Sequence, residues 1–226
     1  MIVLIINMTI SKIKEEKRYI AVEGPIGVGK TSLAKMLATE LGGELLLERT
    51  QDNPFLEKFY RDRKRYAFQT QLFFLLTRYQ QQKDLSQLDL FQKVVISDYL
   101  FDRDRIFAHI NLDKDELRLY ERMYSLLDSR IIRPDLVILL QARPEVLKER
   151  IRARGMHYER DISLEYLKEV VEAYRDYFFY YGESPLLVVD TTEIDFVQSR
   201  EDFEDLLKEI QGARKGTWYY IPLGSR

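Results

Sequence analysis

A glycine-rich loop between a short apolar strand and an amphipathic helix constrains this chain more than any other feature. Residues 24–31 read GPIGVGKT and satisfy the pattern G-x-x-x-x-G-K-[ST] at every position. Residues 19–23 before the loop are rich in β-formers, and residues 31–41 after it place apolar side chains at helical spacing. Such a loop wraps phosphates with backbone N–H groups, and the helix start adds its positive dipole end. The context predicts a nucleoside triphosphate site rather than a plain turn.

The loop supplies the candidate residues for binding the triphosphate. We expect Lys30 to reach the β- and γ-phosphates and the Thr31 hydroxyl to hold Mg²⁺. The full set is Gly24, Gly27, Val28, Gly29, Lys30 and Thr31. The motif does not identify the acceptor. A GTPase or motor ATPase activates water, whereas a kinase of small molecules needs a second pocket and a mobile basic lid, so both classes remain open at this point.

Strand-like and helix-like segments alternate from residue 19 to residue 210, which predicts an α/β fold with one five-stranded parallel sheet covered on both faces. The expected strands are 19–23, 44–48, 94–98, 136–140 and 186–190. The expected helices are 31–41, one that opens at 53–54, 66–90, 115–130, 144–154, 164–181 and 200–210. In the longest helix the expected buried face is Phe68, Leu72, Leu75, Leu76 and Tyr79. We expect one domain over 19–211, an extension over 1–18 and a tail over 212–226, whose last twelve residues show no periodicity.

Composition excludes several classes of protein. The 226 residues carry 35 Lys+Arg against 37 Asp+Glu, a formal net charge of −2 that argues against general binding to nucleic acid or membrane surfaces. The absence of Cys excludes a disulfide framework, a Cys-ligated zinc and a thiol nucleophile, and suits the cytoplasm. No stretch approaches the ~20 apolar residues of a membrane span. His109 and His157 lack partners at metal-ligand spacing, so we expect no histidine metal site.

Carboxylates follow two of the expected strands. Glu48 ends the second strand and Asp98 ends the third. Because ligands bind at the carboxyl ends of parallel strands, both side chains are expected on the same sheet edge as the glycine-rich loop. Glu48 can then take a proton from an attacking hydroxyl, and Asp98 can bind Mg²⁺ directly or through water. Each residue alone also fits an ordinary turn or helix cap.

Arginines gather just after the helix that follows the fourth strand, where a basic lid would close over phosphates. Arg150, Arg152 and Arg154 lie before Gly155, and Arg160 follows. Arg150 and Arg154 share a helix face, so we expect these two to reach the transferring charge and Arg152 to remain in solvent. A wholly solvated helix face is the alternative interpretation.

Several motifs follow one another in order along the chain. They are EGPIGVGKT at 23–31, Glu48 followed by DNPFLEKFY at 52–60, FQTQ at 68–71 with Arg78 and Tyr79, SDY at 97–99, IFA at 106–108, and the lid with its arginines at 150–160. Together they resemble the deoxynucleoside kinase family, including its bacterial deoxyguanosine and deoxyadenosine kinases. The resemblance covers about residues 19–210 and implies the P-loop kinase fold.

The resemblance implies roles for residues of the acceptor pocket. Glu48 corresponds to the base that activates the 5′-hydroxyl. Gln71 corresponds to the glutamine that reads the nucleobase edge with its amide, since Gln69 points to another helix face. Arg78 corresponds to the arginine that lines the 5′-hydroxyl region. Tyr60 and Glu159 correspond to the pair that holds the sugar 3′-hydroxyl.

The resemblance also implies roles on the donor side and around the base. Arg150 and Arg154 match the lid arginines, and Phe107 matches a ring that stacks on the base, with plain core as its alternative. Residues 192–196 resemble the loop that contacts the donor adenine, largely through its backbone, which adds Asp195 and Phe196 to the cofactor-binding set.

One segment departs from the family pattern. Many members carry Asp/Glu-Arg-Ser at the end of the third strand, where this chain has Ser97-Asp98-Tyr99, as in an Asp-Tyr variant among the bacterial deoxyguanosine kinases. The usual arginine position is therefore taken by Asp98. Arg103 and Arg105 are candidates to compensate, and a solvated ion-pair network over residues 102–105 is the alternative.

Taken with the resemblance, the sequence predicts a cytoplasmic, homodimeric enzyme that moves the γ-phosphate of ATP, with Mg²⁺, to the 5′-hydroxyl of a deoxynucleoside. A purine is favoured as the base of the substrate because Ser97-Asp98-Tyr99 resembles the Asp-Tyr variant of the bacterial deoxyguanosine kinases. One alternative is a nucleoside monophosphate kinase of the thymidylate type, in which Arg78 would bind the acceptor phosphate. Another is a non-catalytic structural subunit, against which intact Lys30, Thr31 and Glu48 argue.

Overall fold

The structure, a computed structural model, describes residues 19–87, 94–128, 131–212 and 215–222, so the expected extension over 1–18 lies outside the described residues. One sheet of parallel strands runs in the order β2-β3-β1-β4-β5-β6. The strands are β1 (Tyr19–Glu23), β2 (Glu44–Leu46), β3 (Val95–Ser97), β4 (Leu136–Gln141), β5 (Leu186–Asp190) and β6 (Thr217–Tyr220). The fold class agrees with the α/β parallel sheet expected from the sequence.

The sheet has six strands, so the expectation of five was wrong. β6 comes from the tail and lies parallel to β5, with Leu186 in register with Thr217 and Val189 with Tyr220. Trp218 packs against the main core, while Tyr219 faces solvent. A four-residue strand is too short for its alternation to stand out, and its partner is separated from it in sequence by a whole helix.

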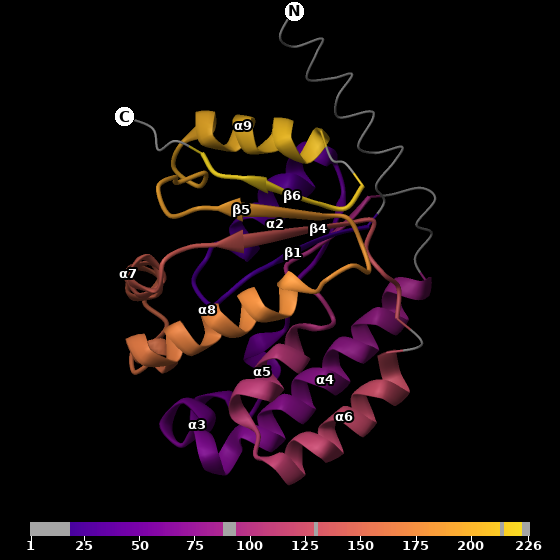
Figure 1. Ribbon diagram of the computed structural model, residues 1–226, viewed down its shortest axis with the longest axis vertical. Helices are drawn as coiled ribbons and strands as arrows, with labels where there is room; N and C mark the ends of the chain where they lie inside the picture. The colour runs from indigo at the N-terminus through magenta and orange to yellow at the C-terminus, as the bar shows by residue number, and fades with distance from the viewer. Residues whose placement is uncertain (1–18, 88–93, 129–130, 213–214, 223–226) are drawn as a thin grey trace, which may run out of the picture.

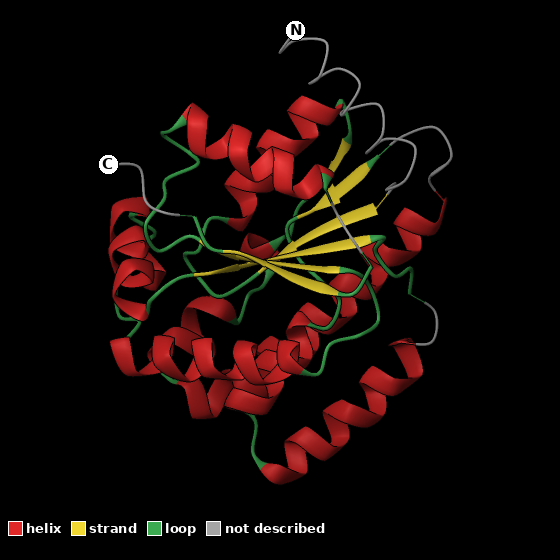
Figure 2. Cartoon of the chain, turned by 45° about the horizontal axis from the view of Figure 1, so that its top comes forward, coloured by secondary structure: helices red, strands yellow, loops and turns green. Residues whose placement is uncertain are grey.

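Helices cover both faces of the sheet. α2 (Lys30–Leu41) and α9 (Arg200–Gln211) lie on one face, and α4 (Arg63–Gln87), α5 (Arg103–Asn111) and α8 (Leu164–Phe179) lie on the other (Figure 1). Figure 2 shows the strands as a single twisted layer between these helices. α6 (Lys114–Asp128) packs outside α4 and α5, and α3 (Leu56–Arg61) precedes α4. α7 (Pro144–Arg154) follows β4 at one end of the sheet. No helix of the described residues is long and apolar enough to cross a membrane.

α4 buries a polar face, which the sequence did not predict. Of the expected buried stripe, Leu75 is fully buried, but Leu76 is 48% exposed. The buried polar side chains of α4 are instead Thr70, Gln71, Arg78, Gln81 and Gln82. Burying polar groups costs free energy unless they find partners, and Thr70, Gln81 and Gln82 donate hydrogen bonds within the protein. The Oε1 of Gln71 has no partner among the described residues, which indicates a ligand site on this side of the helix.

α5 occupies a segment to which the sequence assigned no element. Residues 102–105 alternate in charge, and the buried apolar residues Ile106 and Ala108 are only two positions apart, so the segment shows no helical spacing of apolar side chains. In the structure Arg103 and Asp104 are both buried in the first turn. The position of α5 beside α4 and α8 aims this turn at the carboxyl ends of β1 and β3.

Candidate active site

A cavity of about 240 Å³ lies at the carboxyl edge of the sheet. The glycine-rich loop at 24–31 (the P-loop), α3, α4, α5 and the segment after α7 meet there. Parallel strands end at one edge, so the loops after β1, β2 and β3 contribute side chains to one space. The sequence-predicted residues that line this cavity are Gly27, Lys30, Thr31, Glu48, Tyr60, Gln71, Arg78, Asp98, Phe107, Arg154 and Glu159. Residues from segments more than one hundred positions apart are thus brought together.

The P-loop has the backbone conformation that its glycines permit. Gly24 has φ of +146°, and a Cβ there would lie 2.3 Å from the carbonyl oxygen of Leu140. Gly29 has φ of +107° at the start of α2, and a Cβ there would lie 2.9 Å from the ring of Phe196. These positions exclude side chains for both conformational and steric reasons. The loop can therefore approach phosphates closely with its N–H groups.

The Lys30 ammonium folds back onto the P-loop. Its Nζ donates to the carbonyl oxygens of Gly24 at 2.8 Å and Pro25 at 2.9 Å. Burial, helped by the nearby Arg103 charge, lowers the pKa of Lys30 to about 7, although Glu23, Glu48 and Asp98 oppose the shift. An arriving phosphate would give this cation a stronger partner than two neutral carbonyls.

Asp98 uses both carboxylate oxygens. Its Oδ2 accepts from the Thr31 hydroxyl at 2.5 Å, and its Oδ1 accepts from the backbone N–H of Glu48 at 2.7 Å. Ser97, in contrast, donates its hydroxyl to the backbone oxygen of Tyr99 and lies in the core. A hydroxyl and a carboxylate that meet beside a phosphate loop are the hard oxygen ligands that Mg²⁺ prefers. The residues present therefore fit a magnesium ion.

Glu48 is a buried carboxylate held between two arginines. It contacts Nη2 of Arg78, and its Oε2 lies 3.1 Å from Nη1 of Arg103. Burial by itself would raise the pKa of Glu48, but the charges of Arg103, Arg78 and Lys30 outweigh it and hold that pKa below its usual value. Glu48 is thus ionised at neutral pH and can accept a proton.

The α4 and α5 side chains form the far wall of the cavity. Arg78 pairs with Asp104 as well as with Glu48. Gln71 is buried, and its Oε1 has no hydrogen-bond partner in the part of the chain that the structure describes, whereas Gln69 is exposed. Arg105, the other arginine considered from sequence, pairs with Glu121 at the surface.

Two residues of this wall were not assigned from the sequence. Arg103 was one of two candidates to replace the missing arginine, and Asp104 was expected only as part of a solvated ion-pair network over residues 102–105. The alternating charges of residues 102–105 left the orientation of each undetermined. What decides it is the start of α5 at Arg103, which depends on tertiary packing. In hindsight the one available signal was the motif IFA three residues after Arg103.

Aromatic and charged residues close the cavity near α3. Glu159 is buried and accepts from Nη2 of Arg154 at 2.5 Å. The ring of Tyr158 stacks on that of Tyr60, with centroids 6.1 Å apart and 18° between the planes. Burial raises the pKa of Tyr60 well above its usual value, so the phenol keeps its proton and can donate it in a hydrogen bond.

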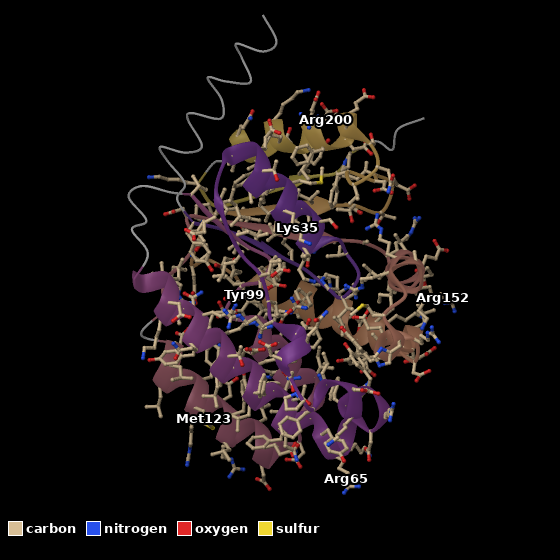
Figure 3. All side chains as sticks on the ribbon, turned by 180° about the vertical axis from the view of Figure 1, so that it is seen from behind. Lys35, Arg65, Tyr99, Met123, Arg152 and Arg200 are labelled. Atoms are coloured by element: carbon tan, nitrogen blue, oxygen red, sulfur yellow. The ribbon has the colours of Figure 1, made fainter. Side chains whose placement is uncertain are left out.

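Arg150 lies elsewhere than the other lid arginine. It does not line the cavity; its guanidinium donates to the backbone oxygens of Thr191 at 2.8 Å and Ile194 at 3.1 Å and to the Thr191 hydroxyl. A longer contact of 3.4 Å reaches the oxygen of Val28 in the P-loop. Arg150 therefore joins α7, the P-loop and the loop after β5. Arg152 is exposed at the outer margin of α7 (Figure 3).

The loop after β5 packs against the P-loop through Phe196, which is buried and touches the Gly29 backbone. The carboxylate of Asp195 accepts from the N–H groups of Val197 and Gln198. Its side chain is thus used to shape the loop, and any contact to a bound base from this position would come from the backbone.

Comparisons with known proteins agree with this geometry. The sequence profile described as deoxynucleoside kinase matches residues 20–213. A deoxyguanosine kinase of Bacillus subtilis is 36% identical over 200 residues, which is 85% of this chain and 96% of that protein. A deoxyadenosine kinase of Dictyostelium discoideum is 36% identical over 173 residues, 74% of this chain and 69% of that protein.

Solved structures of a deoxyadenosine kinase are also similar to this chain. A deoxyadenosine kinase from M. mycoides, with the products dCMP and a flexible dCDP bound, superposes with a TM-score of 0.75 at 27% identity, covering 86% of this chain and 99% of that one. The same kinase with bound dATP gives a TM-score of 0.75 at 26% identity, covering 85% and 98% of the two chains. The family match spans most of the chain, including the residues that line the cavity. The chain belongs to the deoxynucleoside kinase family and is an enzyme that uses a nucleotide phosphate donor.

Proposed function

We propose that this enzyme transfers the γ-phosphoryl group of ATP, with Mg²⁺, to the 5′-hydroxyl of a purine deoxynucleoside. The observation that carries the proposal is one cavity lined by Lys30, Thr31, Glu48 and Gln71 together. A phosphate loop, an ionised carboxylate and an amide whose oxygen has no partner among the described residues are the parts needed for a donor, a proton acceptor and a nucleobase. The names of the relatives from B. subtilis and D. discoideum support purine as the base.

On the donor side, the P-loop residues would hold the triphosphate. Lys30 would leave the carbonyls of Gly24 and Pro25 for the β- and γ-phosphates, and Thr31 with Asp98 would hold Mg²⁺. When bound, the ion neutralises charge on the transferring group. The loop at 195–196 would contact the donor base through its backbone, at a place fixed by Arg150.

On the acceptor side, Glu48 would take the 5′-hydroxyl proton as the oxygen attacks the γ-phosphorus. Gln71 would pair with the base edge, Phe107 would stack on it, and Tyr60 and Glu159 would hold the 3′-hydroxyl. Phosphoryl transfer needs mainly positioning and charge stabilisation, so these roles suffice for catalysis. Arg154, near Glu159, would reach the transferring group when the segment after α7 closes.

A nucleoside monophosphate kinase needs a cation that is free for the acceptor phosphate. Arg78 was the candidate for that role, but it pairs with both Glu48 and Asp104. Two carboxylates already compensate its charge, which favours the neutral 5′-hydroxyl of a nucleoside as the acceptor.

The test is a phosphoryl-transfer assay of the purified protein with Mg-ATP against the four deoxynucleosides and their 5′-monophosphates. We expect turnover of deoxyguanosine or deoxyadenosine and none of the monophosphates. Turnover of monophosphates alone would favour the thymidylate-type alternative. Lys30→Ala is the control, because loss of the phosphate-reading cation should abolish transfer without affecting the fold.

We further propose that the enzyme is a cytoplasmic homodimer that pairs through α4 and α6. Leu76 of α4 and Leu119 and Leu126 of α6 are exposed on neighbouring helices. A second copy that covers these side chains would remove apolar surface from water. Sedimentation of the wild type and of Leu126→Glu would test it: the wild type should sediment as a dimer and the variant as a monomer.

A further inference from the structure

We propose that Arg103 is a catalytic residue: its guanidinium binds the phosphoryl group as it arrives on the acceptor oxygen and then holds the 5′-monophosphate product. This inference rests on the proposed function, because it assigns a role within the same site. It is carried by the place of Arg103 relative to Glu48, by its burial and by its single ion-pair partner among the described residues.

Arg103 is a buried side chain directed into the cavity. It is 9% exposed, it lines the cavity from the first turn of α5, and its Nη1 lies 3.1 Å from Oε2 of Glu48. That Nη1 is buried and makes no hydrogen bond of acceptable geometry to any described residue. The guanidinium also lies 5.6 Å from the Phe107 ring centroid. The head group is therefore held in place with donor capacity to spare.

The distance to Glu48 places Arg103 beside the reacting atoms. A base must lie within about 3 Å of the hydroxyl oxygen from which it takes a proton. The 5′-oxygen that reacts at Glu48 is then a close neighbour of the Arg103 guanidinium, and so is the phosphorus bonded to that oxygen. Lys30 lines the same cavity from the P-loop side, so the phosphoryl group would pass between two cations.

The reaction itself would free Arg103 for the phosphoryl group. The bond from the γ-phosphorus to the bridging oxygen breaks, its electron pair leaves with ADP, a bond forms to the 5′-oxygen, and the 5′-proton moves to Glu48. Protonation cancels the charge of Glu48, which is the one ion-pair partner of Arg103 among the described residues. The guanidinium, left without an ion-pair partner among the described residues, then faces a dianionic phosphate, which it binds with paired N–H donors.

Arg78 cannot take this role as well, although it also touches Glu48. It pairs in addition with Asp104, whose carboxylate takes no part in the proton transfer and keeps its charge. Arg78 thus stays compensated throughout the reaction. After Glu48 is protonated, Arg78 keeps Asp104 as an ion-pair partner, whereas Arg103 keeps none among the described residues.

The start of α5 is anchored independently of Arg103, so substitution should not unfold it. On the outer side, Asp102 accepts from the Tyr124 hydroxyl at 2.5 Å and from Arg133 at 3.3 Å. On the inner side, Oε2 of the buried Glu23 accepts from the backbone N–H of Leu100 at 2.7 Å. These bonds fix both sides of the segment that carries Arg103.

The experiment compares Arg103→Ala and Arg103→Lys with the matched control Arg105→Ala. Arg105 lies on the same helix, pairs with Glu121 at the surface and does not line the cavity. We measure kcat, the KM for deoxyguanosine, and the Kd for deoxyguanosine 5′-monophosphate by calorimetry. Arg103→Ala should lower kcat by about 10²–10³-fold and weaken product binding at least ~10-fold, with the nucleoside KM changed less than ~3-fold. Added guanidinium should restore part of its rate.

Arg103→Lys keeps the charge but loses the planar fork, so it should fall between Arg103→Ala and wild type. Arg105→Ala should stay within about twofold of wild type in every quantity. Equal losses of nucleoside and monophosphate affinity, without rescue by guanidinium, would show that Arg103 only shapes the pocket. Should Arg103→Ala fail to fold, Arg103→Lys with unchanged product affinity and kcat would overturn the proposal. A wild type that phosphorylates no deoxynucleoside would instead refute the proposed function.

Discussion

The hydroxyl of Thr31 lies 2.5 Å from Oδ2 of Asp98, so the start of α2 and the end of β3 meet at a single pair of oxygens. In the family pattern that this sequence resembles, Asp98 takes the position of an arginine and Ser97 that of an acidic residue. Asp98 nevertheless reaches the P-loop, while Ser97 is turned into the core. The carboxylate that meets the P-loop therefore belongs to the first residue after β3 rather than to the strand itself.

Asp98→Asn should raise the Mg²⁺ concentration needed for half-maximal rate by at least ~10-fold, because an amide oxygen is a weaker ligand than a carboxylate. A Mg²⁺ titration of kcat at saturating ATP measures it. Ser97→Ala is the matched control, one residue away, and should leave the Mg²⁺ requirement unchanged. Equal Mg²⁺ curves for wild type and Asp98→Asn would remove Asp98 from the metal site.

Glu48→Gln should lower kcat by ~10²–10⁴-fold with little change in KM, since it keeps the shape of the side chain and removes the base. The low pKa of Glu48 makes it a weak base, and a loose transition state releases the proton late, so we expect the lower end of that range. Steady-state kinetics on protein checked by circular dichroism measure it. A kcat within about twofold of wild type would reduce Glu48 to a turn residue and direct the search to Asp98.

Gln71→Ala should raise the KM for the nucleoside and spare the KM for ATP. A lost amide–base contact in a dry pocket costs ~1–3 kcal/mol, or roughly 5–150-fold in affinity. Gln69→Ala is the control, because Gln69 lies on the same helix but faces solvent. If ATP affinity fell and nucleoside affinity did not, the assignment of the two pockets would be reversed.

Binding of Mg-ATP should weaken as pH rises above 7. The pKa of Lys30 in the free enzyme is about 7, and the triphosphate requires the ionised form. The ionised fraction, and with it the affinity, falls about 5-fold from pH 7 to 8 and ~10-fold more by pH 9. Lys30→Arg stays ionised throughout, so its Kd, although larger, should be nearly flat over the same range. Parallel pH profiles for the two proteins would contradict this account.

Truncation after Gly212 should destabilise the enzyme by removing β6. The loss exposes the edge of β5 and the core side chains that Trp218 and Tyr220 cover, at a cost of ~2–4 kcal/mol. For a chain of this length, Tm should fall by roughly 5–15 °C in a thermal melt. Truncation after Pro222 keeps β6 and should melt within about 2 °C of the full chain. Equal melting of both truncations would mean that β6 contributes nothing to stability.

Local patterns in the sequence predicted most of the sheet and the P-loop, because buried parallel strands read as continuous apolar runs and the loop has a fixed spacing. The strand at 186–190 was predicted at its observed bounds. β6 escaped prediction because it owes its place to β5 rather than to its own four residues. The exposure of the Leu76 side chain was not predicted either, because α4 directs polar residues inward to the cavity.

The site was predictable where one motif fixes one residue, and less so where partners come from separate elements. The P-loop follows from the spacing of its motif, and Glu48 was expected from its place at the end of the second expected strand. The pairing of Arg78 with Asp104, and the choice of Arg103 over Arg105 for Glu48, depend on the axial rotation of α5 against α4. No periodicity in residues 102–105 encodes that rotation. Arg150 was expected to close over the phosphates. Its hydrogen bonds to the backbone oxygens of Thr191 and Ile194 depend on the tertiary fold and could not be predicted from the sequence.

Arg78 is shared between Glu48 and Asp104, which belong to the segment after β2 and to α5. Loss of Arg78 leaves the buried carboxylate of Asp104 without an ion-pair partner among the described residues, at a cost of about 3–5 kcal/mol, a large part of the ~5–15 kcal/mol that stabilises a typical domain. A single replacement of Arg78 is therefore strongly penalised, whereas one coordinated with a change at Asp104 is not. During divergence of such enzymes, these positions of α4 and α5 would drift together, as one epistatic unit.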